Sequence, residues 1–243
     1  MDVVPTAAHE GDSGNRSAAP PSAGESPVIA FLRATTRTRA GAIGAAVIGL
    51  YVLLAAIGPL LAPYSATELD FTALNQAPSS EHYFGTDSLG RDVFSRILIG
   101  ARDTLLMAIG ATAVGVSCGV FVGLVTGYYG GWIDELVMRV VDGLMSFPSL
   151  LLALLIVTTM GSSAWTVLLA IGIVFTPRVA RIVRSAALGV RGQEFVEAAR
   201  LRGESGFYIM LREVLPNVTA PTTVEAAIRL SYAILLTTSL SFL

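Results

Sequence analysis

Long apolar segments separated by shorter polar ones dominate the pattern of this chain. The first, residues 41–61, can cross about 30 Å of hydrocarbon as a helix, because a helix advances about 1.5 Å per residue. Similar stretches cover residues 104–133 and 144–160, a fourth starts at Ala164, and a fifth starts near Thr219. The pattern therefore predicts an all-α membrane protein, a polytopic helical bundle with five visible spans.

The polar segments divide the chain further. Residues 1–27 are rich in Pro, Ser, Gly and Ala and have no apolar period, so we expect a disordered tail. After it we place a flank and first span at 28–62, an external segment at 63–103, and a core of four spans at 104–243. The apolar pattern is still running at Leu243, so we expect the chain to stop short of its natural end.

The placement of arginine predicts the orientation, because cytoplasmic flanks of membrane spans carry an excess of positive charge. Three arginines lie just before the first span and seven lie within 178–213, whereas residues 63–103 hold three arginines against six acids. We therefore expect a multi-pass membrane protein. Its N-terminus and residues 178–213 would lie in the cytoplasm, and residues 63–103 outside.

Composition agrees with this class and excludes several kinds of chemistry. Hydrophobic residues make up 53% of the chain and charged residues only 14%, against about 25% charged in soluble domains. All 16 basic residues are arginine. Without lysine the chain can build neither a phosphate-binding P-loop nor a Schiff base. The lone Cys118 allows no internal disulfide and no cysteine metal site, and we expect no catalytic, cofactor or metal site.

A face of small residues runs along the second span. Its members recur at every fourth position, which places them on one side of a helix: Ala111, Gly115, Gly119, Gly123 and Gly127. Small residues let helix backbones approach closely in lipid. The face is expected to pack against another helix of the same chain or, alternatively, against another subunit.

The external segment carries a dense polar motif. Its marked residues are Gly85, Asp87, Gly90, Arg91, Asp92 and Arg96. With Asp87 or Ser88 as N-cap, the following residues would form an amphipathic helix lying on the outer membrane face. Asp92 and Arg96 would then be an ion pair one turn apart.

Polar residues also line one side of the fifth span. They are Thr222, Glu225, Arg229, Tyr232 and Ser239. Charged residues inside a membrane are candidates for function. Here the stripe could line a hydrated path or an intersubunit seam, or Glu225 and Arg229 could simply neutralise each other.

The cytoplasmic segment between the fourth and fifth spans, about residues 185–216, has the pattern of two short helices with a tight turn. Residues 193–201 suit a helix, and Gly203 can end it in the left-handed conformation. Apolar residues such as Phe207 and Leu211 follow before Pro216. The segment could dock in a groove of a cytoplasmic partner, or rest as a hairpin on the bilayer.

The order of motifs in this segment resembles the EAA loop of ABC importer permeases. The loop residues are Glu197, Ala198, Ala199, Gly203, Leu215 and Pro216. Together with the external motif, residues 130–132, Phe147-Pro148 and Asn217, they resemble the second permease subunit of dipeptide, oligopeptide and nickel systems. The likeness covers about residues 28–243. That family continues after Leu243 into a sixth span, which is missing here.

The resemblance implies a type I ABC importer fold in a bacterial inner or plasma membrane, and a transport subunit that is not itself an enzyme. It implies a second homologous permease, two cytoplasmic ATPases that hold the ATP and magnesium, an external solute-binding protein, and no nucleic acid. The EAA residues would couple ATP hydrolysis to transport. The cargo would be peptide or nickel, and another importer class is the alternative.

A secondary transporter is a further alternative. It would use ion-coupling residues near the membrane midplane and repeated halves. Spans one to four contain no carboxylate, and no repeated half is evident.

Overall fold

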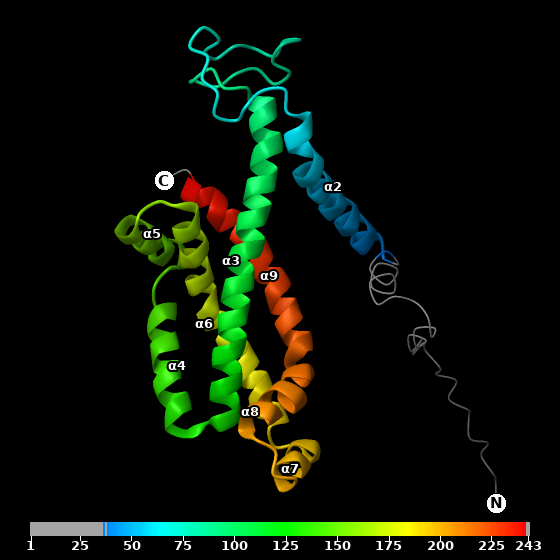
Figure 1. The fold of residues 1–243 in the computed structure, drawn as a ribbon, viewed down its shortest axis with the longest axis vertical. Helices are drawn as coiled ribbons and strands as arrows, with labels where there is room; N and C mark the ends of the chain where they lie inside the picture. The colour runs from blue at the N-terminus through cyan, green and yellow to red at the C-terminus, as the bar shows by residue number, and fades with distance from the viewer. Residues whose placement is uncertain (1–35, 37, 242–243) are drawn as a thin grey trace, which may run out of the picture. The chain divides into compact units, whose positions relative to one another are not determined.

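The computed structural model describes residue 36 and residues 38–241, and every regular element in that part of the chain is a helix (Figure 1). The predicted tail, residues 1–27, lies outside the described residues. The chain divides inside its first described helix, into one unit that ends at Tyr51 and a second that starts at Val52.

Helix α2 (Arg39–Leu61) corresponds to the first predicted span and is long and apolar enough to cross a membrane. Thr38 Oγ1 accepts a hydrogen bond from the N–H of Gly41 at 3.1 Å. Near the end of the helix, a Cβ on Gly58 would lie 2.9 Å from the carbonyl oxygen of Leu98. Glycine therefore lets these two backbones meet.

Helix α3 (Val93–Tyr129) is one continuous helix of 37 residues. The prediction of a separate helix lying on the membrane surface was wrong, because the residues from Val93 onward are the first turns of α3. The N-cap is Asp92, whose carboxylate accepts from the N–H of Ser95 at 2.7 Å. Asp87 and Ser88 lie in the loop before it.

The small-residue face of α3 packs against α6 (Ala164–Val190), which runs parallel to it. A Cβ on Gly119 would lie 2.5 Å from Cβ of Val179, and one on Gly127 would lie 2.7 Å from Cβ of Ala187. Packing within the chain, one of the two predicted alternatives, is confirmed. The close approach explains why small residues recur along this face.

Helices α4 (Gly131–Met145) and α5 (Ser149–Met160) are bent by 90° at the break between them. The stretch 144–160, predicted as the third span, is therefore not one continuous helix but contains the break. The break falls at Phe147-Pro148, because proline lacks an N–H and disfavours the helical conformation of the residue before it. Helix α5 has 12 residues and reaches only about 18 Å.

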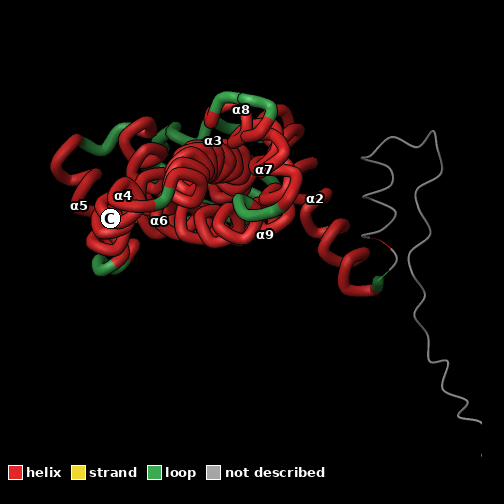
Figure 2. Tube along the Cα trace, turned by 90° about the horizontal axis from the view of Figure 1, so that it is seen from below, coloured by secondary structure: helices red, strands yellow, loops and turns green. Residues whose placement is uncertain are grey.

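Helix α9 (Leu215–Ser241) runs back along α3 and α6, as Figure 1 shows, and Figure 2 views this bundle from below. Two core clusters hold the three helices together. One lies around Val179 and Val218, and the other around Phe175 and Ala233. Most of their members are small or β-branched, and Leu124, Tyr128, Met210 and Phe175 are the larger side chains among them.

Three described helices, α2, α3 and α6, are long and apolar enough to span a membrane, and α4 with α5 makes a fourth crossing if the bent pair is one span. Helix α9 is not among them, because its charged and hydroxyl side chains lower its mean hydropathy. The chain is thus an all-α membrane protein, with three or four of the five predicted spans meeting this criterion among the described residues.

Candidate functional site

The segment between α6 and α9 folds at the end of α3 that lies opposite the external residues (Figure 1). Helix α7 (Glu194–Leu201) forms where residues 193–201 were predicted helical. One side of α7 is fully buried, with Val196 and Ala199 in the core cluster around Val179 and Val218, which also contains Tyr128. Glu197 and Ala198 are exposed on the other side. Ala199 therefore seats the helix, and its neighbours face outward.

Gly203 ends this helix as predicted, with φ of +81°. Its N–H donates to the carbonyl oxygen of Arg200 at 3.0 Å, and the N–H of Glu204 donates to Ala199 at 3.3 Å. No atom lies within 4 Å of a Cβ built on Gly203. The need for glycine is therefore conformational rather than a matter of space.

The second half of the segment differs from the prediction of a separate short helix before Pro216. Helix α8 (Gly206–Ile209) continues through a π-helical turn η1 (Met210–Val214) directly into α9. The N–H of Leu215 donates to Met210, five residues back. Pro216 follows directly after this π-helical turn, and because proline lacks an N–H it donates no backbone hydrogen bond there.

Apolar side chains are exposed on the same segment. Leu201 is 90% exposed, Phe207 60% and Leu211 42%. Together with Glu197 and Ala198 they form the outward face of the segment, hereafter the loop face. Single exposed apolar residues are ordinary on a protein surface, and several of them on one short segment make it a candidate contact site.

Contacts tie α7 to the end of α3. The guanidinium carbon of Arg200 lies 5.2 Å from the centroid of the Tyr128 ring, within cation–π range. At the same end, Tyr128 and Tyr129 pack edge to face with centroids 5.1 Å apart. The Arg200 side chain of α7 is therefore in direct contact with the end of α3.

The polar stripe of α9 contains a buried ion pair. Arg229 Nε lies 2.7 Å from Glu225 Oε1, and the two residues are only 8% and 6% exposed. The Arg229 guanidinium also lies over the rings of Phe175 at 5.5 Å and Tyr232 at 5.0 Å. The predicted neutralisation of one charge by the other is confirmed.

The other members of the stripe are neutral polar residues. The hydroxyl groups of Thr222 and Ser239 donate to carbonyl oxygens of their own helix, Val218 and Leu235. Tyr232 is 51% exposed. The paired charges therefore form the polar centre of α9, and a path-lining role for the stripe stays a prediction.

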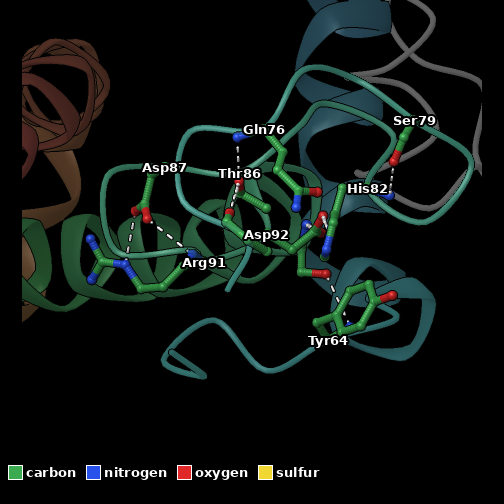
Figure 3. A network of polar contacts seen from close by, with 10 residues as sticks. Tyr64, Gln76, Ser79, His82, Thr86, Asp87, Arg91 and Asp92 are labelled. Carbon is green, nitrogen blue, oxygen red and sulfur yellow. Dashed lines mark hydrogen bonds and ion pairs between the residues drawn. The ribbon is translucent and has the colours of Figure 1, made fainter. Parts of the chain in front are cut away.

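The external motif folds into a network before α3, shown in Figure 3. Asp87 accepts from the backbone N–H groups of Leu89 and Arg91 at 2.9 and 3.0 Å, and from Arg91 Nε at 2.8 Å. Arg96 also bonds to this carboxylate. Burial raises the pKa of Asp87, but the hydrogen bonds from Arg91 and Leu89 and the Arg91 charge outweigh this and lower it to about 2.

Asp92 pairs with His82 rather than with Arg96, so that part of the prediction was wrong. The distance from His82 Nδ1 to Asp92 Oδ1 is 3.0 Å, and Asp92 is 3% exposed. The chain turns back between the two residues, and sequence spacing along a helix could not have indicated this. Gly85 and Gly90 have φ of +73° and +74°, and a Cβ on Gly90 would lie 1.8 Å from the carbonyl oxygen of Asp70.

These features agree with the families that the chain matches. Residues 119–243 match the profile of binding-protein-dependent transport system inner membrane components. Residues 26–78 match the N-terminal TM domain of oligopeptide transport permease C. The chain belongs to this family of permeases.

Curated relatives agree with this family assignment. The chain is 41% identical over 201 residues to the dipeptide transport system permease protein DppC of Alkalihalophilus pseudofirmus, covering 83% of this chain and 66% of that protein. It is 41% identical over 200 residues to the glutathione transport system permease protein GsiD of Pectobacterium atrosepticum, covering 80% and 66%. For GsiD of Escherichia coli the identity is 38%, covering 88% and 71%. The permease thus spans just under two thirds of the first two relatives.

The matched regions include the segments described above. The profile over residues 119–243 contains α7, Gly203 and the stripe of α9, and the match over 26–78 contains α2 and the start of the external network. The narrower resemblance to the second permease subunit of dipeptide, oligopeptide and nickel systems is confirmed as a family resemblance by the oligopeptide permease C match and the DppC relative.

Proposed function

We propose that this chain is a membrane subunit of an ATP-driven importer of peptides. In this role it forms half of a translocation path with a second permease, receives solute from an external binding protein, and is driven by two cytoplasmic ATPases that hold ATP and magnesium. The family assignment and the names of the dipeptide and glutathione relatives support the cargo class, since glutathione is itself a peptide.

The observation that supports coupling most directly is the two-sided character of α7. Its buried side is anchored in the core through Val196 and Ala199, and the loop face with Glu197 and Leu201 is exposed. An ATPase that binds the loop face would move α7 as a rigid body. The contact of Arg200 with Tyr128 at 5.2 Å would pass that movement to α3.

The orientation is part of the proposal. The loop face and the external network lie at opposite ends of α3 (Figure 1). With the segment between α6 and α9, which carries four arginines, in the cytoplasm, the N-terminus is cytoplasmic and the network around Asp87 and Asp92 faces the binding protein.

The test compares two charge reversals. Glu197→Arg alters the loop face, and Glu135→Arg, at an exposed glutamate of α4 outside that face, is the matched control. Both are reconstituted with the partner permease, the ATPases and the binding protein in proteoliposomes. We expect wild type and the control to take up a labelled dipeptide with ATP, and Glu197→Arg to lose at least about tenfold in uptake through its repelled contact.

Membrane insertion, measured by accessibility of an N-terminal tag, should be the same in all three proteins. Uptake by wild type that continues without ATP or without the ATPases would contradict the proposed importer. Equal uptake by the two variants would contradict the assignment of the loop face as the docking surface.

A further inference from the structure

Three arginines lie at intervals of three on α6, and two of them face aspartates of α4. Arg184 holds Asp134 through two bonds, one of them from Nη2 to Oδ2 at 2.5 Å. Arg181 holds Asp142 through a single bond. The two ion pairs connect α6 to α4 along this side. In these two pairs, each arginine charge has an aspartate partner.

The third arginine, Arg178, lacks such a partner among the described residues. It is exposed and lines a cavity of about 380 Å³ at the break between α4 and α5. The α4 chain has turned away at Ser146, so no aspartate follows at the level where a third pair would form. The cavity has the volume of a small-ligand site.

The position of Arg178 makes the unpaired charge informative. It lies fourteen residues after Ala164, the start of α6, or about 21 Å along the helix. Counted from that end of the helix, the position still falls inside a hydrocarbon layer roughly 30 Å thick. An ionised side chain at this depth faces a free-energy penalty unless it is paired or hydrated, and it marks a solute path more often than a structural site.

The rest of the cavity wall is complementary to a small anion with an apolar part. Ser146 and Ser149 line it together with Arg178, and Phe147, Leu152 and Val174 are among its apolar lining residues. The Ser146 hydroxyl donates to Gly143 of its own helix at 2.6 Å. No carboxylate lines the cavity, so nothing in it repels an anion.

We propose that this cavity binds the carboxylate of the solute as it passes through the membrane, with Arg178 as the residue that recognises it. The planar guanidinium suits a carboxylate because it can donate two parallel hydrogen bonds. The proposal rests on the proposed function, and it adds that the permease itself distinguishes a free carboxyl terminus from a neutral one.

Uptake of a dipeptide and of its C-terminal amide by the full reconstituted complex tests this assignment. The same binding protein serves every variant, so its own preference cancels when the acid-to-amide ratio is compared between permeases. We expect Arg178→Gln to lower kcat/KM for the free acid about tenfold, the usual size of a charged hydrogen bond, and to leave the amide within about twofold. Arg139→Gln, an exposed arginine outside the cavity, should leave the ratio unchanged.

A binding measurement that needs no transport accompanies uptake. In a Cys118→Ser background, Ser149→Cys places a reactive thiol in the cavity of the purified complex. The free dipeptide should slow its alkylation, the amide should not, and Arg178→Gln should abolish the protection.

The outcomes separate the two proposals. Protection by the acid with no ATP-dependent uptake would refute the proposed importer and keep the carboxylate site. An unchanged acid-to-amide ratio in Arg178→Gln, or equal loss of both solutes, would overturn the site. The site is also overturned if the effect of Arg178→Gln disappears in vesicles without acidic lipids, because the occupant is then a lipid headgroup.

Discussion

Replacing Gly123 by alanine tests whether α3 and α6 are held together by close backbone approach. The added Cβ would lie 2.5 Å from the carbonyl oxygen of Ala180, 2.7 Å from Cβ of Val183 and 2.9 Å from the backbone nitrogen of Arg184. Unstrained contacts of carbon lie near 3.5 Å. Because two of these atoms belong to the α6 backbone, the helices must separate locally by roughly 1 Å.

Overpacking of this kind destabilises a protein by about 1–3 kcal/mol. For a chain of this size, about 1 kcal/mol shifts Tm by roughly 2–4 °C. We therefore expect Gly123→Ala to lower Tm by roughly 2–12 °C. The fall combines strain with the loss of packing along the small-residue face.

Two alanine substitutions in the same helix are matched controls. Gly100 has no atom within 4 Å of its Cβ position, so Gly100→Ala should keep or raise Tm, since alanine favours a helix over glycine by about 0.5–1 kcal/mol. A Cβ on Gly110 would meet Cδ1 of Leu168 at 2.7 Å, the end of a flexible side chain. Gly110→Ala should therefore lie between the other two.

The measurement is the melting of the detergent-purified proteins, followed by the fraction that remains monodisperse after heating. The order of Tm should be Gly100→Ala, then Gly110→Ala, then Gly123→Ala. If Gly123→Ala melts with Gly100→Ala, the close contact between α3 and α6 is not a source of stability and the reasoning fails.

Two other predictions follow from the charged groups. The folded-state pKa of Asp87, about 2, is below its unfolded value of about 3.9. Its bonds therefore stabilise the external network above about pH 4 and are lost as the pH falls toward 2. In wild type, limited proteolysis within residues 63–92 should accelerate only as the pH falls from about 4 toward 2. In Asp87→Asn it should already be fast at neutral pH. Acceleration at pH 6 in wild type would contradict the role of the Asp87 charge. For the buried pair in α9, Glu225→Gln or Arg229→Met alone should destabilise by roughly 3–5 kcal/mol, because each leaves an uncompensated charge. The double variant should lose less than the sum, and additive losses in a thermal double-mutant cycle would show that the two residues do not interact.

The external network shows where local pattern reaches its limit. The order of Asp87, Asp92 and Arg96 favours helical pairing one turn apart, yet Asp92 bonds to His82 and Arg96 bonds to Asp87. Gly85 and Gly90, both with positive φ, allow the chain to turn back between His82 and Asp92. Such pairing depends on a loop path, and spacing rules apply only inside regular elements.

The unpaired Arg178 illustrates the same limit at a candidate site. Its charge near the end of an apolar segment is visible in the sequence, but the aspartates that pair with Arg181 and Arg184 are 39 and 50 residues away. The contrast between two paired arginines and one unpaired arginine appears only when α4 and α6 lie side by side.

The sequence by itself determined the membrane class, the small-residue face, the short helix ended by Gly203 and the pairing of Glu225 with Arg229. Each of these depends on composition or on neighbours within a few turns, where helix geometry makes spacing decisive. Only the tertiary structure decided that α3 begins at Val93, that the chain bends by 90° between α4 and α5, and which charges meet between helices. These outcomes depend on contacts between segments far apart in the chain, and the energies that select them arise only when those segments are packed together.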